Sequence, residues 1–363
     1  MNYLNSISSR KIKQFIIDKA LVLVLIFMIL FMVIIEPTFL QWRVIKDILT
    51  QSSVKLIVAL GLLFPLLLGG TDLAGGRQVG LAAVIVASMS QPLLNSHRFF
   101  PNLPELPILV PIFTALTITA LIGLINGLMI AKLKMAPFIA TYGMATIVYG
   151  INCLYFAKPP NRSQPIGGIR DDLTFLSSYK VFGEFSLLIV IALIAAVLCW
   201  FLLNRTVFGK HLYIVGGNSE AAKVSGVNVS SIIIAAFIIE SCLVGFAGIL
   251  EVARTGGANS AYGFSYEFDA ISSCVVGGVS LSGGIGKISG VIIGVIIFTI
   301  ISYGLAFIER RNFIKIIRLC NGSSSEPHAA FSGLPGFPPA VFYACFPFQF
   351  APHRTGPAAQ GPR

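Results

Sequence analysis

The stretch from Leu106 to Ala131 reads LPILVPIFTALTITALIGLINGLMIA and contains no charged residue. It is longer than the roughly 20 apolar residues that a helix needs to cross the hydrocarbon core of a bilayer. Eight further apolar runs lie between residues 20 and 308, separated by polar loops. These runs are Ala20–Ile35, Leu56–Gly70, Gln78–Leu94, Met135–Ala157, Phe185–Leu203, Ser231–Leu250, Ala270–Ser282 and Ile288–Ile308. The sequence therefore predicts an all-α, polytopic membrane bundle of about nine spanning or re-entrant helices over residues 20–308.

One of these runs, Ala270–Ser282, is short and rich in glycine, so we expect a broken or re-entrant helix there. Two glycine pairs, Gly123 with Gly127 and Gly290 with Gly294, have the spacing that lets membrane helices approach closely. In a chain with 35 glycines the same spacing also arises by chance. The pairs therefore do not by themselves distinguish one kind of helical bundle from another.

The composition agrees with a membrane location. The chain of 363 residues is 55% hydrophobic and 11% charged, whereas soluble domains carry about 25% charged residues. The net charge is +11, but the basic residues lie in loops between apolar runs, which indicates a membrane protein and not a nucleic-acid partner. A basic segment, residues 1–19, precedes the first run and predicts a cytoplasmic N-terminus. Its basic residues are Arg10, Lys11, Lys13 and Lys19.

The sequence offers no site for metal, cofactor or covalent chemistry. The six cysteines are scattered without a CxxC pair, so we predict neither a metal site nor a disulfide. The stretch Gly283–Ile288 (GGIGKI) resembles a phosphate-binding loop but lacks the first glycine and the final serine or threonine of that motif. We therefore expect no ATP site on this chain and no enzymatic activity of its own.

The sequence changes character after Ile308. Eight of the 19 prolines fall within residues 309–363, and proline disrupts both helices and sheets. We expect this segment to be an aberrant or disordered tail that does not belong to the fold.

Glu240 lies near the middle of the run Ser231–Leu250. A charge at the bilayer centre costs about 2.5–3.5 kcal/mol on insertion scales. One interpretation is a proton or substrate site, and the other is a neutral glutamate bonded to a neighbouring helix. The sequence shows no partner acid for Glu240, which favours the structural interpretation.

The most informative loop is Gly216–Gly226, which reads GGNSEAAKVSG. Asn218 or Ser219 can cap a helix, Glu220 suits its positive end, and Gly226 can stop it. A helix of one or two turns is marginal alone, so it needs a partner surface unless the segment is a plain connector.

This loop resembles the cytoplasmic coupling loop of ABC-type monosaccharide permeases of the ribose/galactose class. Four other segments are similar to that family in order and spacing. They are Thr50–Gly61 (TQSSVKLIVALG), Gly70–Ala83 (GTDLAGGRQVGLAA), Gly123–Ala131 (GLINGLMIA) and Tyr266–Gly284 (YEFDAISSCVVGGVSLSGG). The Gly-Gly-Arg-Gln of Gly75–Gln78 is most similar to the galactose/methyl-galactoside import permeases. The similarity spans about Ile34–Phe307 and stops there. After this point the family would continue into one more spanning helix, which we do not expect in this chain.

The resemblance implies a multi-pass protein of the bacterial inner membrane that imports galactose or methyl galactoside by alternating access. It implies four partners: a cytoplasmic ABC ATPase, a second permease copy, a periplasmic sugar-binding protein and the sugar. The residues implied to couple to the ATPase are Gly217, Asn218, Glu220, Ala221, Ala222, Ser225 and Gly226. Candidate polar residues of the pathway or of helix packing in this sequence are Asp72, Arg77, Gln78, Asn126 and Glu240, of which Glu240 departs from the small or polar residue expected in the family. The alternatives are a permease for ribose or xylose, and a proton-coupled secondary transporter that uses Glu240.

Overall fold

The computed structural model describes residues 21–322 except 35–36, 94, 96 and 182, and only the backbone of 37–38 and 307–322. The chain divides into two units, Met1–Leu305 and Ala306–Arg363, and the packing below lies within the first. The basic N-terminal segment 1–19 and the proline-containing part of the tail lie outside the described residues.

Within the described part of the chain, six helices are long and apolar enough to cross a membrane. They are α2 (Trp42–Leu67), α4 (Leu109–Ala131), α5 (Pro137–Ala157), α7 (Leu187–Arg205), α10 (Val229–Thr255) and the first part of α12 (Ile288–Gly322). Three further predicted runs form shorter helices, which are Leu21–Ile34, α3 (Gly75–Met89) and α11 (Tyr266–Val276). Every predicted run thus contains a helix, but nine full spans are not confirmed.

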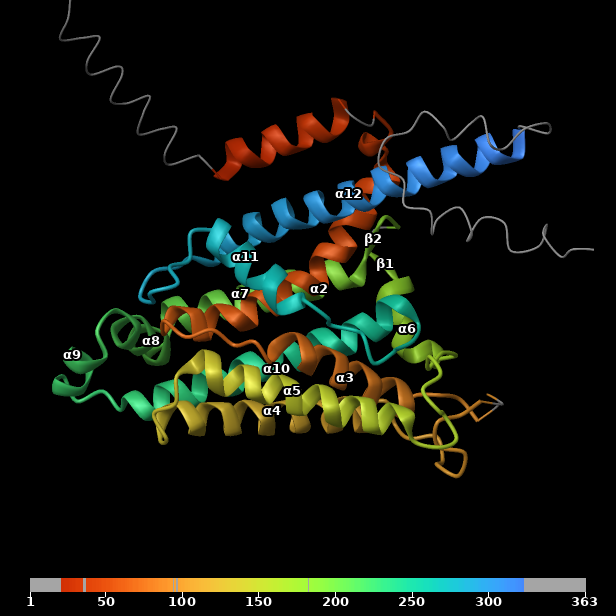
Figure 1. Cartoon of the computed structure of the whole chain (residues 1–363). Coiled ribbons are helices and arrows are strands. Elements are labelled where there is room, and N and C mark those ends of the chain that lie inside the picture. The colour runs from red at the N-terminus through yellow and green to blue at the C-terminus, as the bar shows by residue number, and fades with distance from the viewer. Residues whose placement is uncertain (1–20, 35–36, 94, 96, 182, 323–363) are drawn as a thin grey trace, which may run out of the picture. The chain divides into compact units, whose positions relative to one another are not determined.

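The remaining elements are short and lie between the long helices. They are η1 (Pro37–Leu40), α6 (Asp171–Ser178), the antiparallel strands β1 (Lys180–Val181) and β2 (Phe185–Ser186), α8 (Val207–Gly217) and α9 (Ser219–Val224). Figure 1 shows α8 and α9 at one end of the bundle and α6 with the two strands at the other. The two ends of the molecule therefore carry different structures.

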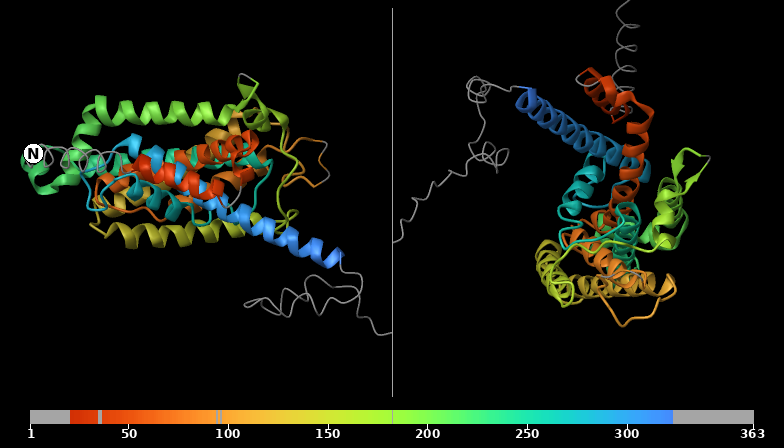
Figure 2. Two further views of the ribbon diagram at one scale, coloured as in Figure 1. Left: turned by 90° about the horizontal axis from the view of Figure 1, so that it is seen from above. Right: turned by 90° about the vertical axis from the view of Figure 1, so that its right-hand side faces the viewer.

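Helix α10 is the central element of the bundle. It packs against α2, α3 and α4, and it also contacts α6, α8 and α9. Most of the apolar part of α2 is buried (78%), whereas only 28% of that of α4 is buried. Seen from above, α7 (green) and α5 (yellow) lie on opposite sides of the bundle (Figure 2, left). The outer helices present broad apolar faces, as a membrane location requires.

The predicted close packing at the glycine pairs is confirmed. An added Cβ at Gly123 or Gly127 of α4 would overlap the α10 backbone at Phe237 or Ile234. The pair Gly290 and Gly294 brings α12 equally close to the backbone of α11. Small residues are needed at these positions because side chains would separate the helices.

Two helices extend far beyond the predicted runs. Helix α2 begins at Trp42 and not at Leu56, because charged residues interrupt its apolar pattern without interrupting the helix. Two of them are paired: Lys46 with Glu184 and Lys55 with Asp269, each over 2.8 Å. At the other end of the chain, α12 continues to Gly322 and does not end near Ile308, because no proline occurs between Ile288 and Pro327.

Candidate functional site

The loop between α7 and α10 folds into two helices that turn back on each other. The predicted short helix is present but is confined to Ser219–Val224, and Gly217 is the last residue of α8. Asn218 caps α9, with its Oδ1 accepting a hydrogen bond from the backbone N of Ala221 over 3.0 Å. Gly226 has a φ of 82°, a left-handed conformation that stops the helix and that glycine adopts without strain.

The two faces of α9 have different surroundings. Ala222 is fully buried against the rest of this chain, while Ala221 and Ser225 are exposed. Val224 is 90% exposed, which is the highest exposure of any large apolar side chain in the described residues. Ala222 is therefore small because it packs against other parts of this chain. The apolar side chain of α9 that is exposed and could contact a partner is Val224.

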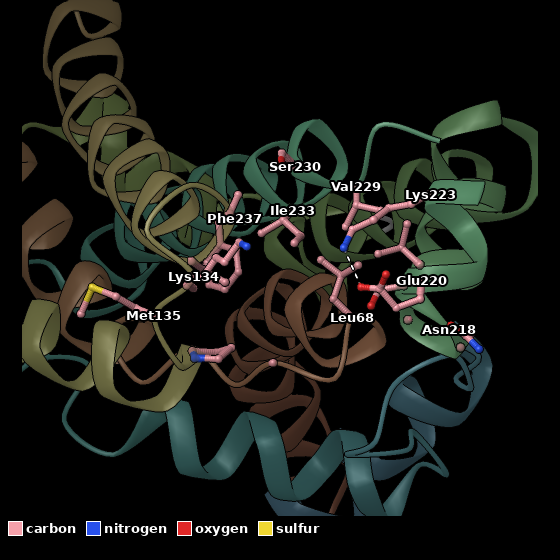
Figure 3. A pocket seen from close by; sticks show the side chains of 18 residues that line it. Leu68, Lys134, Met135, Asn218, Glu220, Lys223, Val229, Ser230, Ile233 and Phe237 are labelled. Carbon is pink, nitrogen blue, oxygen red and sulfur yellow. Dashed lines mark hydrogen bonds and ion pairs between the residues drawn. The ribbon is translucent and has the colours of Figure 1, made fainter. Parts of the chain in front are cut away.

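A pocket of about 720 Å³ opens beside α9 (Figure 3). Its walls come from the end of α2, the α4–α5 loop, α8, α9 and the start of α10. The labelled lining residues in Figure 3 are Leu68, Lys134, Met135, Asn218, Glu220, Lys223, Val229, Ser230, Ile233 and Phe237. The pocket is apolar on its α10 side and charged on its α9 side.

Charges at the α9 wall are balanced locally. Lys223 Nζ lies 2.6 Å from Oε1 of Glu220, and this ion pair is drawn in Figure 3. The ion pair, with a smaller contribution from Lys134 across the pocket, lowers the pKa of Glu220 below its ordinary range. Glu220 therefore stays ionised at neutral pH, and α9 presents a zwitterionic rim to solvent.

A buried polar cluster lies about one helical turn deeper than the pocket. Three of the predicted residues meet there: Asp72 from the α2–α3 turn, Asn126 from α4 and Glu240 from α10, all almost completely buried. Asn126 Nδ2 donates to Asp72 Oδ2 over 3.4 Å, and the backbone N of Ala74 donates to Asp72 Oδ1 over 2.6 Å. Ser241 Oγ donates to Glu240 Oε2 over 2.9 Å. The cluster joins three elements in the middle of the bundle.

Glu240 was expected to have no partner acid, and that expectation is wrong. The Asp72 carboxyl is close enough to interact with it directly, because the turn after α2 folds back against the middle of α10. The side chain that donates a hydrogen bond to Glu240 is Ser241. Ser241 is the next residue of α10 and does not lie on a neighbouring helix. Glu240 Oε1 has no hydrogen-bond partner among the described residues.

Helix α5 fixes the turn that carries Asp72. Thr141 Oγ1 accepts a hydrogen bond from the backbone N of Leu73 and donates to the carbonyl of Thr71, both over 3.2 Å. Thr141 and Ser241 belong to this site but had no distinguishing signal in the sequence, since single hydroxyl residues are common in membrane helices.

The other two predicted polar residues are not part of the cluster. Gln78 is fully buried, and neither its amide oxygen nor its nitrogen has a partner among the described residues. Arg77 points away from the cluster, toward two aromatic rings. Its guanidinium carbon lies 4.4 Å from the ring centroid of Tyr149 and 4.7 Å from that of Phe264.

Comparison with known proteins places the chain in a transport family. Residues 44–331 match the family described as branched-chain amino acid transport system / permease component. This match continues 24 residues beyond Phe307, where the resemblance was expected to end. No solved structure shows a significant match.

The relatives by sequence are sugar import permeases. The galactose/methyl galactoside import permease protein MglC of Haemophilus influenzae is 48% identical over 303 residues, covering 82% of this chain and 90% of the relative. The protein of the same name in Escherichia coli is 43% identical over 84% of this chain and 91% of its own length. The ribose import permease protein RbsC of Haemophilus influenzae is 33% identical over 86% and 93% of the two chains. From the family match and these identities, the chain belongs to the permease-component family of bacterial import systems.

Proposed function

We propose that the chain is the membrane-spanning permease subunit of an ATP-driven sugar importer, with galactose or methyl galactoside as substrate. The observation that carries this proposal is the 48% identity to a galactose/methyl galactoside import permease over 82% of the chain. The identity to the ribose permease is lower, at 33%, which favours galactose over ribose.

We infer that the protein lies in a bacterial inner membrane with the α8–α9 end and the N-terminus in the cytoplasm. Its partners in this proposal are a cytoplasmic ABC ATPase, a second copy of the permease and a periplasmic sugar-binding protein. ATP hydrolysis belongs to the ATPase subunit. In this arrangement the surface formed by α8 and α9 faces the ATPase.

Helix α9 is suited to docking on the ATPase because Val224 is an exposed apolar side chain on a capped helix. A movement of α9 would reach the bundle through α8. Gly216 of α8 lies against the carbonyl of Leu67 at the end of α2, and that carbonyl also accepts a hydrogen bond from Gly284 N over 2.8 Å. The residues after Leu67 form the turn that carries Asp72. Docking of the ATPase on α9 would therefore shift the position of the α2–α3 turn and change the access of substrate to the translocation pathway.

The docking test changes the exposed valine without touching the buried face of α9. Val224→Glu should reduce co-purification of the ATPase and galactose uptake at least tenfold, because a charge would enter an apolar contact. Val224→Ile keeps the contact apolar and serves as the matched control. Membrane insertion should be the same in both variants. Normal uptake by the Val224→Glu protein would overturn the docking assignment.

The importer itself is tested by uptake of labelled galactose in cells that contain the partner subunits, with and without this chain. Uptake should require the chain and ATP. A proton-coupled transporter built on Glu240 would instead need no ATPase subunit and would stop when the proton gradient is removed. Uptake that survives loss of the ATPase would therefore contradict the proposal.

A further inference from the structure

Arg77 lies level with the middles of two long helices, α5 and α10. Helix α3 starts inside the bundle: a Cβ at Gly75, its first residue, would contact Glu240 Oε1 at 3.1 Å. Glu240 is near the middle of α10 (Val229–Thr255). Tyr149, on which the Arg77 guanidinium stacks, is near the middle of α5 (Pro137–Ala157). Both α5 and α10 therefore place Arg77 at the level of their middles, which corresponds to the centre of the bilayer.

The guanidinium at this depth has no direct ion-pair or hydrogen-bond partner among the described residues. Arg77 is partly exposed, and it forms neither an ion pair nor a hydrogen bond with any residue of the described chain. Lipid tails offer no acceptor for its N–H groups, and an unpaired charge facing lipid is strongly disfavoured. The face that carries Arg77 must therefore meet water or polar ligand atoms.

The two aromatic rings fix the orientation of the guanidinium. The guanidinium carbon of Arg77 lies over the rings of Tyr149 and Phe264, at 4.4 and 4.7 Å from their centroids, an arrangement stabilised by cation–π attraction. The N–H groups of Arg77 have no hydrogen-bond acceptor among the described residues, so they remain available. A guanidinium that is oriented by stacking and has free donors is prepared to bind oxygen atoms of a ligand.

Glu267 supplies acceptors beside these donors. The residue is 6% exposed, its Oε2 has no hydrogen-bond partner among the described residues, and Arg77 acts on its carboxyl electrostatically. Together the two side chains offer both donors and acceptors. Hydroxyl groups both donate and accept hydrogen bonds, so this pair suits a neutral polyol better than an anion.

Space is available along α5 on either side of Tyr149. A Cβ added at Gly143 or Gly150 would meet no atom within 4 Å, and Thr146 between them is exposed. Gly150 leaves room beside the ring of Tyr149, which is 42% exposed. Aromatic rings that are exposed beside polar groups can pack against the apolar face of a sugar ring.

We propose that Arg77, Glu267, Tyr149 and Phe264 form a sugar-contact site in the translocation pathway, with a pyranose as ligand. In this site Arg77 donates to sugar hydroxyl oxygens, and the Glu267 carboxyl accepts from a hydroxyl. The exposed ring edges pack against the sugar carbons. The proposal rests on the proposed function, because it takes the sugar and the pathway from it.

Cys153 provides a direct test because it is partly exposed and lies one helical turn after Tyr149 on α5. In a variant whose other five cysteines are replaced by serine, a membrane-impermeant methanethiosulfonate reagent is applied to the assembled importer during ATP turnover with its binding protein. We expect labelling of Cys153, slowed at least threefold by galactose but not by sucrose. No labelling, or labelling that is indifferent to galactose, would overturn the site.

Substitution of Arg77 separates a sugar contact from a purely structural role. Arg77→Met should lower galactose uptake at least tenfold while ATPase co-purification and binding-protein-stimulated ATP hydrolysis stay near normal. Arg77→Lys should retain part of the uptake, and Arg43→Met, at an exposed arginine near the start of α2, should retain all of it. Normal uptake in Arg77→Met would overturn the proposal. If the ATPase instead fails to bind the unchanged chain, the proposed function itself is wrong.

Discussion

The side-chain amide of Asn126 donates a hydrogen bond to Oδ2 of Asp72 over 3.4 Å and joins α4 to the turn that starts α3. Both residues are almost completely buried. A buried carboxyl oxygen that loses its donor keeps the full cost of desolvation. The pair therefore couples the stability of the α2–α3 turn to the position of α4.

Replacement of Asn126 by leucine should destabilise the solubilised protein by about 1–3 kcal/mol, the range for an unsatisfied buried polar group. The measurement is the shift of the thermal unfolding midpoint in detergent. In an Asp72→Leu background the same substitution should cost less, because the carboxyl it leaves unpaired is absent. Equal losses in both backgrounds would show that the two side chains are not coupled.

Substitution of Glu240 by glutamine should leave ATP-driven transport intact between pH 6 and 8. Glutamine has the shape of a neutral glutamic acid and can still accept from Ser241 Oγ, which lies 2.9 Å from Glu240 Oε2. Its amide can also donate to the Asp72 carboxyl, which interacts with Glu240. Uptake at several pH values is the measurement. Loss of transport together with loss of proton dependence would support a proton-coupled mechanism instead.

The lengths of the uncharged runs predicted the helices well but not the contacts between them. The boundaries of α4, α5 and α7 lie within three residues of the predicted ones, because few charges interrupt these segments. Asp72 and Glu240 are far apart in the sequence, and only the turn after Leu67 brings them together. The stacking of Arg77 on Phe264 likewise depends on a loop whose path carries no periodic signal. Short-range patterns thus predicted the elements, whereas the polar sites arise from long-range packing.

The close approach of α4 and α10 at Gly127 predicts a sharp steric effect. An added Cβ there would lie 2.8 Å from the Cα of Ile234, so Gly127→Leu should force the helices apart and lower the unfolding midpoint strongly. Gly143→Ala is the control, because nothing lies within 4 Å of a Cβ at that position and alanine favours helix over glycine. A similar midpoint for Gly127→Leu and the unchanged protein would contradict the packing.

The contacts of Glu184 predict a pH-dependent contribution to stability. Its Oε2 accepts from Lys46 Nζ and Trp42 Nε1, both over 2.8 Å, and these contacts lower the pKa of Glu184. A carboxyl with a lowered pKa stabilises the folded state above its ordinary pKa, and this contribution disappears as the pH falls through the folded value. The unfolding midpoints of the unchanged protein and Glu184→Gln should therefore differ at pH 7 and converge as the pH falls below the folded pKa of Glu184. A difference that is constant with pH would contradict the ion pair.

Truncation of the chain from its C-terminus tests the role of residues 309–363. Helix α12 runs from Ile288 to Gly322 without an internal proline, and the family match ends at residue 331. Seven of the eight prolines after Ile308 follow residue 331. We therefore expect a chain that ends at residue 331 to insert and import galactose normally, since it keeps the whole matched region.

A chain that ends at Ile308 loses the last part of α12 and should accumulate poorly, because small losses are a large share of marginal stability. Immunoblots of membranes and uptake assays measure both effects. Normal accumulation and uptake of the Ile308-ended chain would show that residues 309–363 do not belong to the functional fold.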